Sequence, residues 1–303
     1  MEERKVIVCR GLKKSYGRKA ALKGIDLELG AGRIIGLLGP NGSGKTTLIK
    51  LLCGLLHPTA GEVRIGGYKP GPETKALISY LPDRPYFEDW MRVRDALDMF
   101  TDFYGDFDRN RAAEMCESLG ITEKMSIKTM SKGTREKLQL VLVMSRSAMV
   151  YLLDEPIAGV DPAARDYILQ TILTNYNPAG TVIISTHLIA DIEKVLDEAI
   201  FLKEGVVVRH DAVDDIREKE GKTLDALFRE IFRVMPEKLN KPRLVITPAK
   251  TSAEEAPKAE APETAEAPEA DVIPLGASQG EAPCENEAEE TAAEEVKEDE
   301  DHA

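Results

Sequence analysis

Apolar residues up to about Arg209 alternate between short unbroken runs and helical spacing. Short strands are predicted at Val6–Arg10 and Gly24–Leu29, and compact runs typical of buried strands follow at Arg33–Leu38, Met149–Leu153 and Thr181–Ser185. Helical spacing occurs at Thr46–Leu56, at Arg92–Leu119 with a break near Gly105, and at Lys132–Ser147. Strands that alternate with helices predict an α/β fold with a largely parallel sheet.

The sequence continues with a helical segment and then changes in composition. Ile216–Val234 is predicted to be helical, and we favour packing of its apolar face on its own domain over a contact with a partner. The residues of this face are Leu224, Leu227, Phe228, Ile231 and Phe232. From about Thr247 the sequence is mainly Ala, Pro and Glu. Such a composition buries too little apolar surface to offset chain entropy, so we expect disorder there.

The net charge of −13 is concentrated in the acidic tail. Residues 251–303 contain 18 acidic residues and two lysines, so the residues before them carry a net charge of +3. The acidic tail disfavours direct contact with nucleic acid. The polar first ten residues lack the apolar core of a signal peptide, and no apolar run approaches the roughly 20 residues that span a bilayer. Since the four cysteines are widely separated, we expect a cytosolic protein with reduced thiols.

A glycine-rich loop follows the apolar run at Arg33–Leu38 and precedes a predicted helix. Its sequence fits the spacing GxxxxGK[ST] of a phosphate-binding loop and consists of Gly39, Pro40, Asn41, Gly42, Ser43, Gly44, Lys45, Thr46 and Thr47. The glycines let backbone N–H groups approach phosphate oxygens, and the helix offers its positive N-terminus. We expect Lys45 to reach the β- and γ-phosphates and the Thr46 hydroxyl to hold Mg²⁺. The loop alone does not distinguish between families of nucleotide hydrolases.

Two other apolar runs lead into polar side chains. Met149–Leu153 is followed by Asp154 and Glu155, and His187 comes two residues after Thr181–Ser185. Ligands bind at the carboxyl ends of parallel strands. We therefore expect Asp154 to hold Mg²⁺, directly or through water, and Glu155 to polarise the attacking water as a general base. His187 is expected to contact the γ-phosphate or the transition state rather than to serve only in packing.

The order and spacing of these segments resemble the nucleotide-binding subunits of ABC transporters. The resemblance covers about residues 6–209 and rests on Tyr16, Gly39–Thr47, Tyr80–Asp83, Met130–Thr134, Asp154–Glu155, Gly159–Asp161 and His187. It is strongest toward stand-alone subunits of bacterial drug- or lipid-type exporters. It implies a P-loop NTPase with a mostly parallel central sheet, an antiparallel β element at the N-terminal side and an inserted helical subdomain. The expected parts are an ATPase domain at 1–210 with the helical subdomain at about 84–147, a helical extension at 211–246 and an acidic tail at 247–303.

The resemblance also implies roles for single residues. Tyr16 would stack on the adenine ring of ATP, with an ordinary loop aromatic as the alternative. Ser131 and Gly133 belong to the segment that corresponds to the LSGGQ signature, and they would cap the γ-phosphate bound to the opposite subunit. Asp161 would lie in the loop that communicates across the dimer interface. One loop and one signature in a chain imply a two-fold head-to-tail pair, a homodimer or a heterodimer, with two ATP molecules between the subunits.

The sequence departs from the family pattern at three positions. Lys132 replaces the first glycine of the signature, and Thr134 replaces its glutamine. Asp83 stands where the family has a glutamine that touches Mg²⁺ and links the site to the permease. A carboxylate can still ligate the metal, so we expect Asp83 to do so, with Lys132 offsetting part of its negative charge.

The resemblance implies a separate transmembrane permease as a further partner, docked on the segment Arg84–Leu119. Tyr86, Phe87 and Trp90 cluster there and form either a docking patch or the core of the subdomain. The expected function is an ATPase on the inner face of the cell membrane that powers this permease as an exporter. The alternatives are a soluble ABC-type ATPase that acts on ribosomes or DNA, and a slow regulatory ATP sensor. A single cassette without inserted coiled coils disfavours the first, and the retention of Glu155 and His187 disfavours the second.

Overall fold

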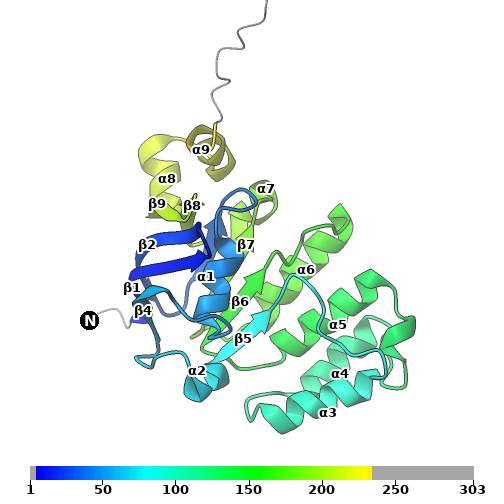
Figure 1. Cartoon of the computed structure of the whole chain (residues 1–303). Helices are drawn as coiled ribbons and strands as arrows, with labels where there is room; N and C mark the ends of the chain where they lie inside the picture. The colour runs from blue at the N-terminus through cyan, green and yellow to red at the C-terminus, as the bar shows by residue number, and fades with distance from the viewer. Residues whose placement is uncertain (1–4, 234–303) are drawn as a thin grey trace, which may run out of the picture. The chain divides into compact units, whose positions relative to one another are not determined.

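A computed structural model of the protein describes residues 5–233, apart from the side chains of residues 163 and 164. The predicted acidic tail and the end of the predicted helical extension lie outside the described residues. Strands β1 (Lys5–Tyr16) and β2 (Lys19–Gly30) pair antiparallel, and β4 (Ala60–Ile65) pairs with the other edge of β1. This three-stranded sheet is the predicted antiparallel element at the N-terminal side (Figure 1).

A second sheet has six strands in the order β5-β6-β7-β3-β8-β9. Its parallel strands are β3 (Ile34–Leu38), β5 (Ile78–Leu81), β6 (Val150–Asp154), β7 (Thr181–Thr186) and β8 (Glu198–Lys203). The last strand, β9 (Val206–Ala212), runs antiparallel to β8. The prediction of an α/β fold with a mostly parallel central sheet is therefore confirmed.

Helices follow most of these strands in the chain. They are α1 (Lys45–Leu52), α2 (Pro72–Leu77), α3 (Val93–Phe103), α4 (Arg109–Ser118), α5 (Lys132–Met144), α6 (Pro162–Asn175), α7 (Ile189–Ile192), α8 (Val213–Glu220) and α9 (Leu224–Ile231), with 3₁₀ turns at Ile127–Thr129 and Glu193–Val195. The predicted break near Gly105 separates α3 from α4. The helix predicted at 216–234 is two helices, because Gly221 ends α8 in the left-handed conformation, with φ of 61°.

The two faces of the six-stranded sheet support separate hydrophobic cores. Successive side chains of a strand point to opposite faces. Ile35 and Leu37 of β3 therefore pack in the core that contains α1 and the three-stranded sheet. Ile34 and Leu38 pack in the core that contains residues of α5, α6 and α7. Because β3, β6 and β7 are parallel, their carboxyl ends meet at one edge of the sheet, beside the N-terminus of α1.

Helices α3, α4 and α5 lie side by side beyond β5 (Figure 1). They share a third core, which includes Leu97, Cys116 and Leu138. Arg146, whose side chain is only 2% exposed, is one link between these helices and the sheet. Its guanidinium donates to the carboxylate of Asp106 and to the backbone oxygens of Ala76 and Ile78.

Helices α8 and α9 pack on the hydrophobic core that contains residues of α5, α6 and α7. Leu224 and Leu227 are buried there, and Phe228, Ile231 and Phe232 are packed against it while remaining partly exposed. This face therefore packs on its own domain, as the sequence analysis favoured. In the described part of the chain, no helix combines the length and the apolar character needed to cross a membrane.

Candidate nucleotide site

The phosphate-binding loop lies between β3 and α1, as its sequence predicts. Two of its glycines are sterically required: a Cβ on Gly39 would lie 2.4 Å from the carbonyl oxygen of Leu202, and one on Gly44 would lie 2.8 Å from Cδ2 of Leu22. Gly44 also has φ of 113°, which favours glycine. The loop curls around the Lys45 side chain, which is buried and donates to the Gly39 carbonyl oxygen at 2.8 Å.

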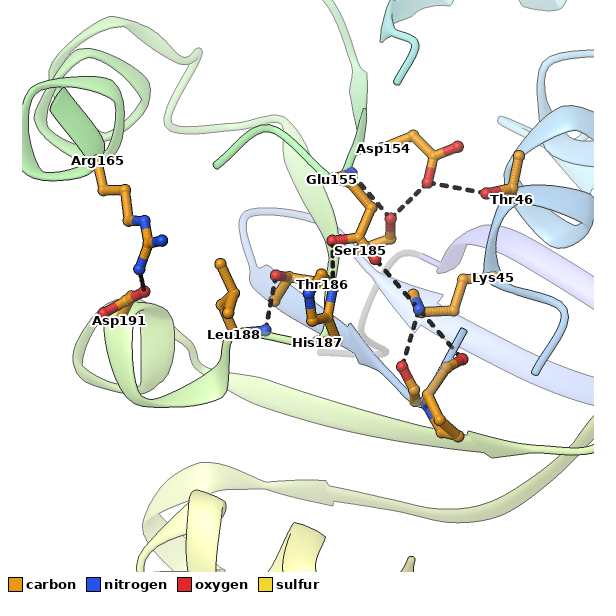
Figure 2. A network of polar contacts seen from close by, with 12 residues as sticks. Lys45, Thr46, Asp154, Glu155, Arg165, Ser185, Thr186, His187, Leu188 and Asp191 are labelled. Carbon is orange, nitrogen blue, oxygen red and sulfur yellow. Dashed lines mark hydrogen bonds and ion pairs between the residues drawn. The ribbon is translucent and has the colours of Figure 1, made fainter. Parts of the chain in front are cut away.

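The ammonium of Lys45 also contacts a carboxylate at the end of β6. Its Nζ lies 3.2 Å from Oε1 of Glu155, and Nδ1 of His187 lies 3.0 Å from the other oxygen of the same carboxylate. Figure 2 shows these three side chains converging from the loop, from the end of β6 and from the end of β7. The structure therefore brings together Lys45, which was expected to reach the phosphates, with Glu155 and His187, and these are the three residues predicted to serve in catalysis.

Asp154 lies directly behind this group and is 1% exposed. Its Oδ1 atom accepts from the hydroxyl of Ser185 at 2.6 Å and from the hydroxyl of Thr46 at 3.3 Å. Burial raises the pKa of the Asp154 carboxyl, and hydrogen bonds from Ser185 and Thr46 oppose that rise. Its Oδ2 atom is buried and accepts no hydrogen bond from the residues that the structure describes.

The sequence analysis missed Ser185. It is the last residue of the apolar run that precedes His187, so it was assigned to a buried strand and given no chemical role. In the structure it is fully buried opposite Asp154 in the strand register. A hydroxyl within an otherwise apolar strand is the signal that could have identified it, because a buried polar group needs a hydrogen-bond partner.

A cavity of about 570 Å³ opens in front of the loop. The predicted site residues that line it are Tyr16, Asn41, Gly42, Gly44, Lys45, Thr46, Thr47, Asp83 and Glu155. Tyr16 lies at the turn between β1 and β2, where its side chain is 49% exposed. Nζ of Lys14 lies 5.4 Å from the centre of its ring. An exposed aromatic ring beside a phosphate loop is available for stacking on a base.

Asp83 also borders a second cavity of about 300 Å³, together with Lys132, Glu155 and His187. Lys132 belongs to the signature segment, and its Nζ lies 3.7 Å from Oε1 of Glu136. Asp83 and Lys132 thus border the same cavity, but the ion pair of Lys132 is with Glu136. The compensation of Asp83 by Lys132 that the sequence analysis suggested remains a hypothesis.

The remaining predicted residues lie away from the loop. Ser131 is the N-cap of α5 and accepts from the backbone N–H of Thr134 at 3.1 Å. Gly133 is exposed, with open space around the position of a Cβ. Asp161 is exposed directly before α6. Ser131, Gly133 and Asp161 line neither the cavity of 570 Å³ nor the cavity of 300 Å³.

This arrangement fits a nucleoside triphosphate and its metal ion. Gly42 and Gly44 of the loop line a cavity of about 570 Å³, and the ammonium of the buried Lys45 lies beside them. The buried Oδ2 atom of Asp154 lacks a protein donor in the described range, and a carboxylate oxygen of this kind suits Mg²⁺ or its bound water. Glu155 and His187 add a hydrogen-bonded carboxylate and imidazole, a pair of the kind that accepts a proton from water in hydrolases. Fold and site together define a P-loop nucleotide hydrolase.

Comparison with known proteins identifies the family. A profile described as ABC transporter matches residues 22–158. The linearmycin resistance ATP-binding protein LnrL of Bacillus subtilis (strain 168) is 30% identical over 224 residues, which are 71% of this chain and 72% of that protein. The daunorubicin resistance ATP-binding protein DrrA3 of Streptomyces coeruleorubidus is 30% identical over 74% of both chains. The chain belongs to the ABC transporter ATP-binding proteins, and its activity is that of an ATPase.

Solved structures agree with this assignment. The ATP-binding subunit of an ABC transporter matches with a TM-score of 0.68 and 27% identity, over 75% of this chain and 99% of that one. The fold is also shared with an ATP-binding cassette solved as a dimer in a post-hydrolysis state with ADP and Pi. That match has a TM-score of 0.61 at 21% identity, over 68% of this chain and 98% of that one.

Proposed function

We propose that this chain dimerises around ATP and powers a separate membrane permease as the engine of an exporter. The observation that carries this proposal is that Ser131 and Gly133 of the signature segment lie outside the nucleotide cavity of their own chain, although Lys132 between them borders the neighbouring cavity with Glu155. Lys45 and Glu155 line the nucleotide cavity, whereas Ser131 and Gly133 line neither cavity. A site of this kind is completed when a second subunit supplies its signature segment.

The side chains around the loop have distinct proposed roles. Lys45 binds the β- and γ-phosphates after exchanging the carboxylate of Glu155 for phosphate oxygens. Glu155 then accepts a proton from the attacking water as the general base. His187, hydrogen-bonded to Glu155, keeps that carboxylate in position and contacts the γ-phosphate. Tyr16 stacks on the adenine ring.

The metal site is proposed from residues on three segments. Thr46, Asp83 and Asp154 would hold Mg²⁺, either directly or through its bound waters. When bound, this ion neutralises the charge that develops on the phosphates. The hydroxyl of Thr46 and the carboxylate of Asp154 are already hydrogen-bonded to each other. Asp83, in the loop after β5, lines the cavity of 570 Å³, as Thr46 does.

The exposed N-terminus of α5 is the group that each subunit supplies to its partner. Its backbone N–H groups and its positive helix end suit a phosphate. The open surroundings of Gly133 leave room for a bound γ-phosphate at the interface. Asp161 is exposed before α6, where it can communicate with the facing subunit.

The permease is proposed to dock in an apolar groove between the sheet and α3. This groove has a volume of about 440 Å³, and its lining includes Leu55, Tyr86, Phe100 and Phe103. Leu55 is 55% exposed and Phe103 is 76% exposed, which is costly unless a partner covers them. A short amphipathic helix of the permease would bury these side chains.

The predicted aromatic cluster of Tyr86, Phe87 and Trp90 was expected to form either a docking patch or the core of the helical subdomain. Its three residues do not all take the same role. Phe87 packs against the core of α3, α4 and α5, so it is part of that core. Tyr86 lines the apolar groove. Trp90 is 73% exposed and is absent from the groove lining, so it offers a further apolar contact nearby.

The direction of transport is proposed from the relatives. The names of LnrL and DrrA3 assign each of them to resistance against a toxic compound, which is the role expected of an exporter. We extend this role to the present chain, peripheral on the inner face of the membrane, with a permease and a second ATPase subunit as partners and without direct nucleic-acid contact. The proposed parts are those expected from the sequence: an ATPase domain at 1–210 with its helical subdomain at about 84–147, then the extension and the tail.

Co-purification tests this proposal. The tagged full chain is recovered from gently solubilised membranes, and the bound chains are identified. A multi-span membrane protein in near-equal amount would support the proposal and would point to the transported compound. Recovery only from the soluble fraction, with ribosomes, nucleic acid or no partner, would overturn the transport role and leave the ATPase activity standing.

A further inference from the structure

Ser185 makes contact with both catalytic-site carboxylate residues at the end of β6. Its hydroxyl donates to Oδ1 of Asp154 at 2.6 Å, and its Oγ accepts from the backbone N–H of Glu155 at 3.1 Å. A serine hydroxyl has one proton to donate and lone pairs to accept with, so both hydrogen bonds can exist at once. Figure 2 shows Ser185 between the two acidic residues.

The backbone of Glu155 needs this support. Its φ is 52°, in the left-handed region that residues with side chains rarely adopt. Both hydrogen bonds from its N–H go to Ser185, to the backbone oxygen at 3.0 Å and to Oγ. The left-handed turn redirects the chain as it leaves β6, so the Glu155 side chain reaches Lys45 and His187 while Asp154 stays buried.

The same hydroxyl helps to fix the orientation of the Asp154 carboxylate. Ser185 and Thr46 both donate to Oδ1, which leaves Oδ2 buried without a donor among residues 5–233. Without the Ser185 hydroxyl, the carboxylate would lose its shorter hydrogen bond and could rotate. The orientation of this carboxylate beside Thr46 would then no longer be fixed, and metal binding would weaken.

We propose that Ser185 is a positioning residue that aligns the metal-binding carboxylate and the general base through a single hydroxyl. This inference rests on the roles proposed above for Asp154 and Glu155. It predicts that loss of the hydroxyl weakens metal binding and slows hydrolysis together, while metal-free ATP binding by the loop is preserved. A hydroxyl that serves only in packing would change stability without separating these three properties.

Thr181 supplies a matched control on the same strand. It is also fully buried, and its hydroxyl donates to the Gly30 carbonyl oxygen at 2.8 Å, at the opposite end of β7. Thr181→Val therefore removes one buried hydroxyl hydrogen bond from β7 without touching either acidic residue. Ser185→Thr keeps the hydroxyl and suits a strand, so it is the rescue variant. Ser185→Cys, close in size to serine with a weaker donor, replaces Ser185→Ala if alanine prevents folding.

The experiment measures three quantities on the full-length variants: kcat for ATP hydrolysis, Mn²⁺ affinity of the ATP complex from the electron paramagnetic resonance signal of free Mn²⁺, and ATP affinity in the presence of a chelator. We expect Ser185→Ala to lower kcat and Mn²⁺ affinity by about 10- to 100-fold and to leave metal-free ATP affinity within about twofold. Ser185→Thr should recover most of both losses. Thr181→Val should match the wild-type protein in all three quantities.

Wild-type Mn²⁺ affinity and kcat in a folded Ser185→Ala variant would overturn the inference. Equal losses in Thr181→Val would overturn it as well, because they would assign the effect to any weakening of β7. A wild-type protein that does not hydrolyse ATP would instead count against the function of the whole site. The two failures are therefore distinguishable.

Discussion

The ammonium of Lys45 lies 3.2 Å from Oε1 of Glu155, and both side chains are largely shielded from solvent. Lys45 is expected to bind phosphate and Glu155 to activate water. In this arrangement the two side chains pair with each other instead. A triphosphate that takes the ammonium would release the carboxylate for catalysis. The base would then become available only after the substrate has bound, which links hydrolysis to a filled site.

Glu155→Gln should separate ATP binding from hydrolysis. The amide preserves the size of the side chain but cannot accept a proton, so we expect kcat to fall by about 10²- to 10⁴-fold. ATP should still bind, and the dimer should accumulate on size-exclusion chromatography in its presence. Glu136→Gln is the matched control, because Glu136 borders the neighbouring cavity and pairs with Lys132. Rapid turnover by Glu155→Gln would contradict the assignment of the base.

Asp83 should contribute to metal binding through an oxygen atom. Asp83→Ala is expected to lower the Mg²⁺ affinity of the ATP complex by about tenfold, whereas Asp83→Gln, which retains an oxygen ligand, should stay near the wild-type value. Competition between Mg²⁺ and Mn²⁺, followed by the signal of free Mn²⁺, measures this affinity. Unchanged affinity in both variants would remove Asp83 from the metal site.

Arg146 should be a major determinant of stability, because it fastens α3 and α4 to the sheet. Its guanidinium is buried, pairs with Asp106 and lies 3.7 Å from the ring centre of Tyr104. Arg146→Met leaves Asp106 and the backbone oxygens of Ala76 and Ile78 without this donor, so we expect a loss of about 3 to 5 kcal/mol in the free energy of unfolding. Urea denaturation measures it.

A surface arginine provides the comparison for that value. Arg229 is 78% exposed and pairs with Asp225 on the same helix. Arg229→Met should change the free energy of unfolding by no more than about 0.5 kcal/mol. A similar cost for the two variants would mean that Arg146 does not hold the helices to the sheet.

Glu198 should make stability depend on pH in the acid range. The hydrogen bond from His210 holds the pKa of the Glu198 carboxyl below its ordinary value of 4.5. Since the folded state lowers this pKa, the stabilisation is fully present above about pH 4.5 and is lost as pH falls through the folded-state pKa. Glu198→Gln should therefore lose less stability than the wild-type protein on acidification below that pH. Equal acid sensitivity of Tm in both proteins would contradict this.

The sequence predicted most of the elements that build the site. Three of the predicted strands are buried in the sheet at Ile34–Leu38, Val150–Leu153 and Thr181–Ser185, with Arg33 and Met149 just outside them. The loop glycines have the spacing that phosphate binding requires. Strands β8 and β9 were not predicted, because their apolar runs, Ala199–Leu202 and Val206–Val208, are only four and three residues long. Their pairing comes from tertiary contacts with β3 and from the turn at Glu204 and Gly205.

Contacts between distant residues could not be predicted from the sequence. The hydrogen bond between Ser185 and Asp154 joins strands β7 and β6, and only the strand register places the two residues opposite each other. Sequence spacing predicts which end of a strand a residue occupies, but the register determines its partner.

The central claim is that each ATP site is completed by a second subunit, and mixing two inactive variants tests it most directly. Lys45→Ala disables the phosphate loop, and Gly133→Asp places a negative charge in the signature segment at an exposed position with open space around it. Each variant alone should be nearly inactive. Random pairing in an equal mixture makes about half of the dimers mixed, each with one intact site, so activity should return to about a quarter of the wild-type value. A mixture no more active than its folded components, beside an active wild-type protein, would contradict the account.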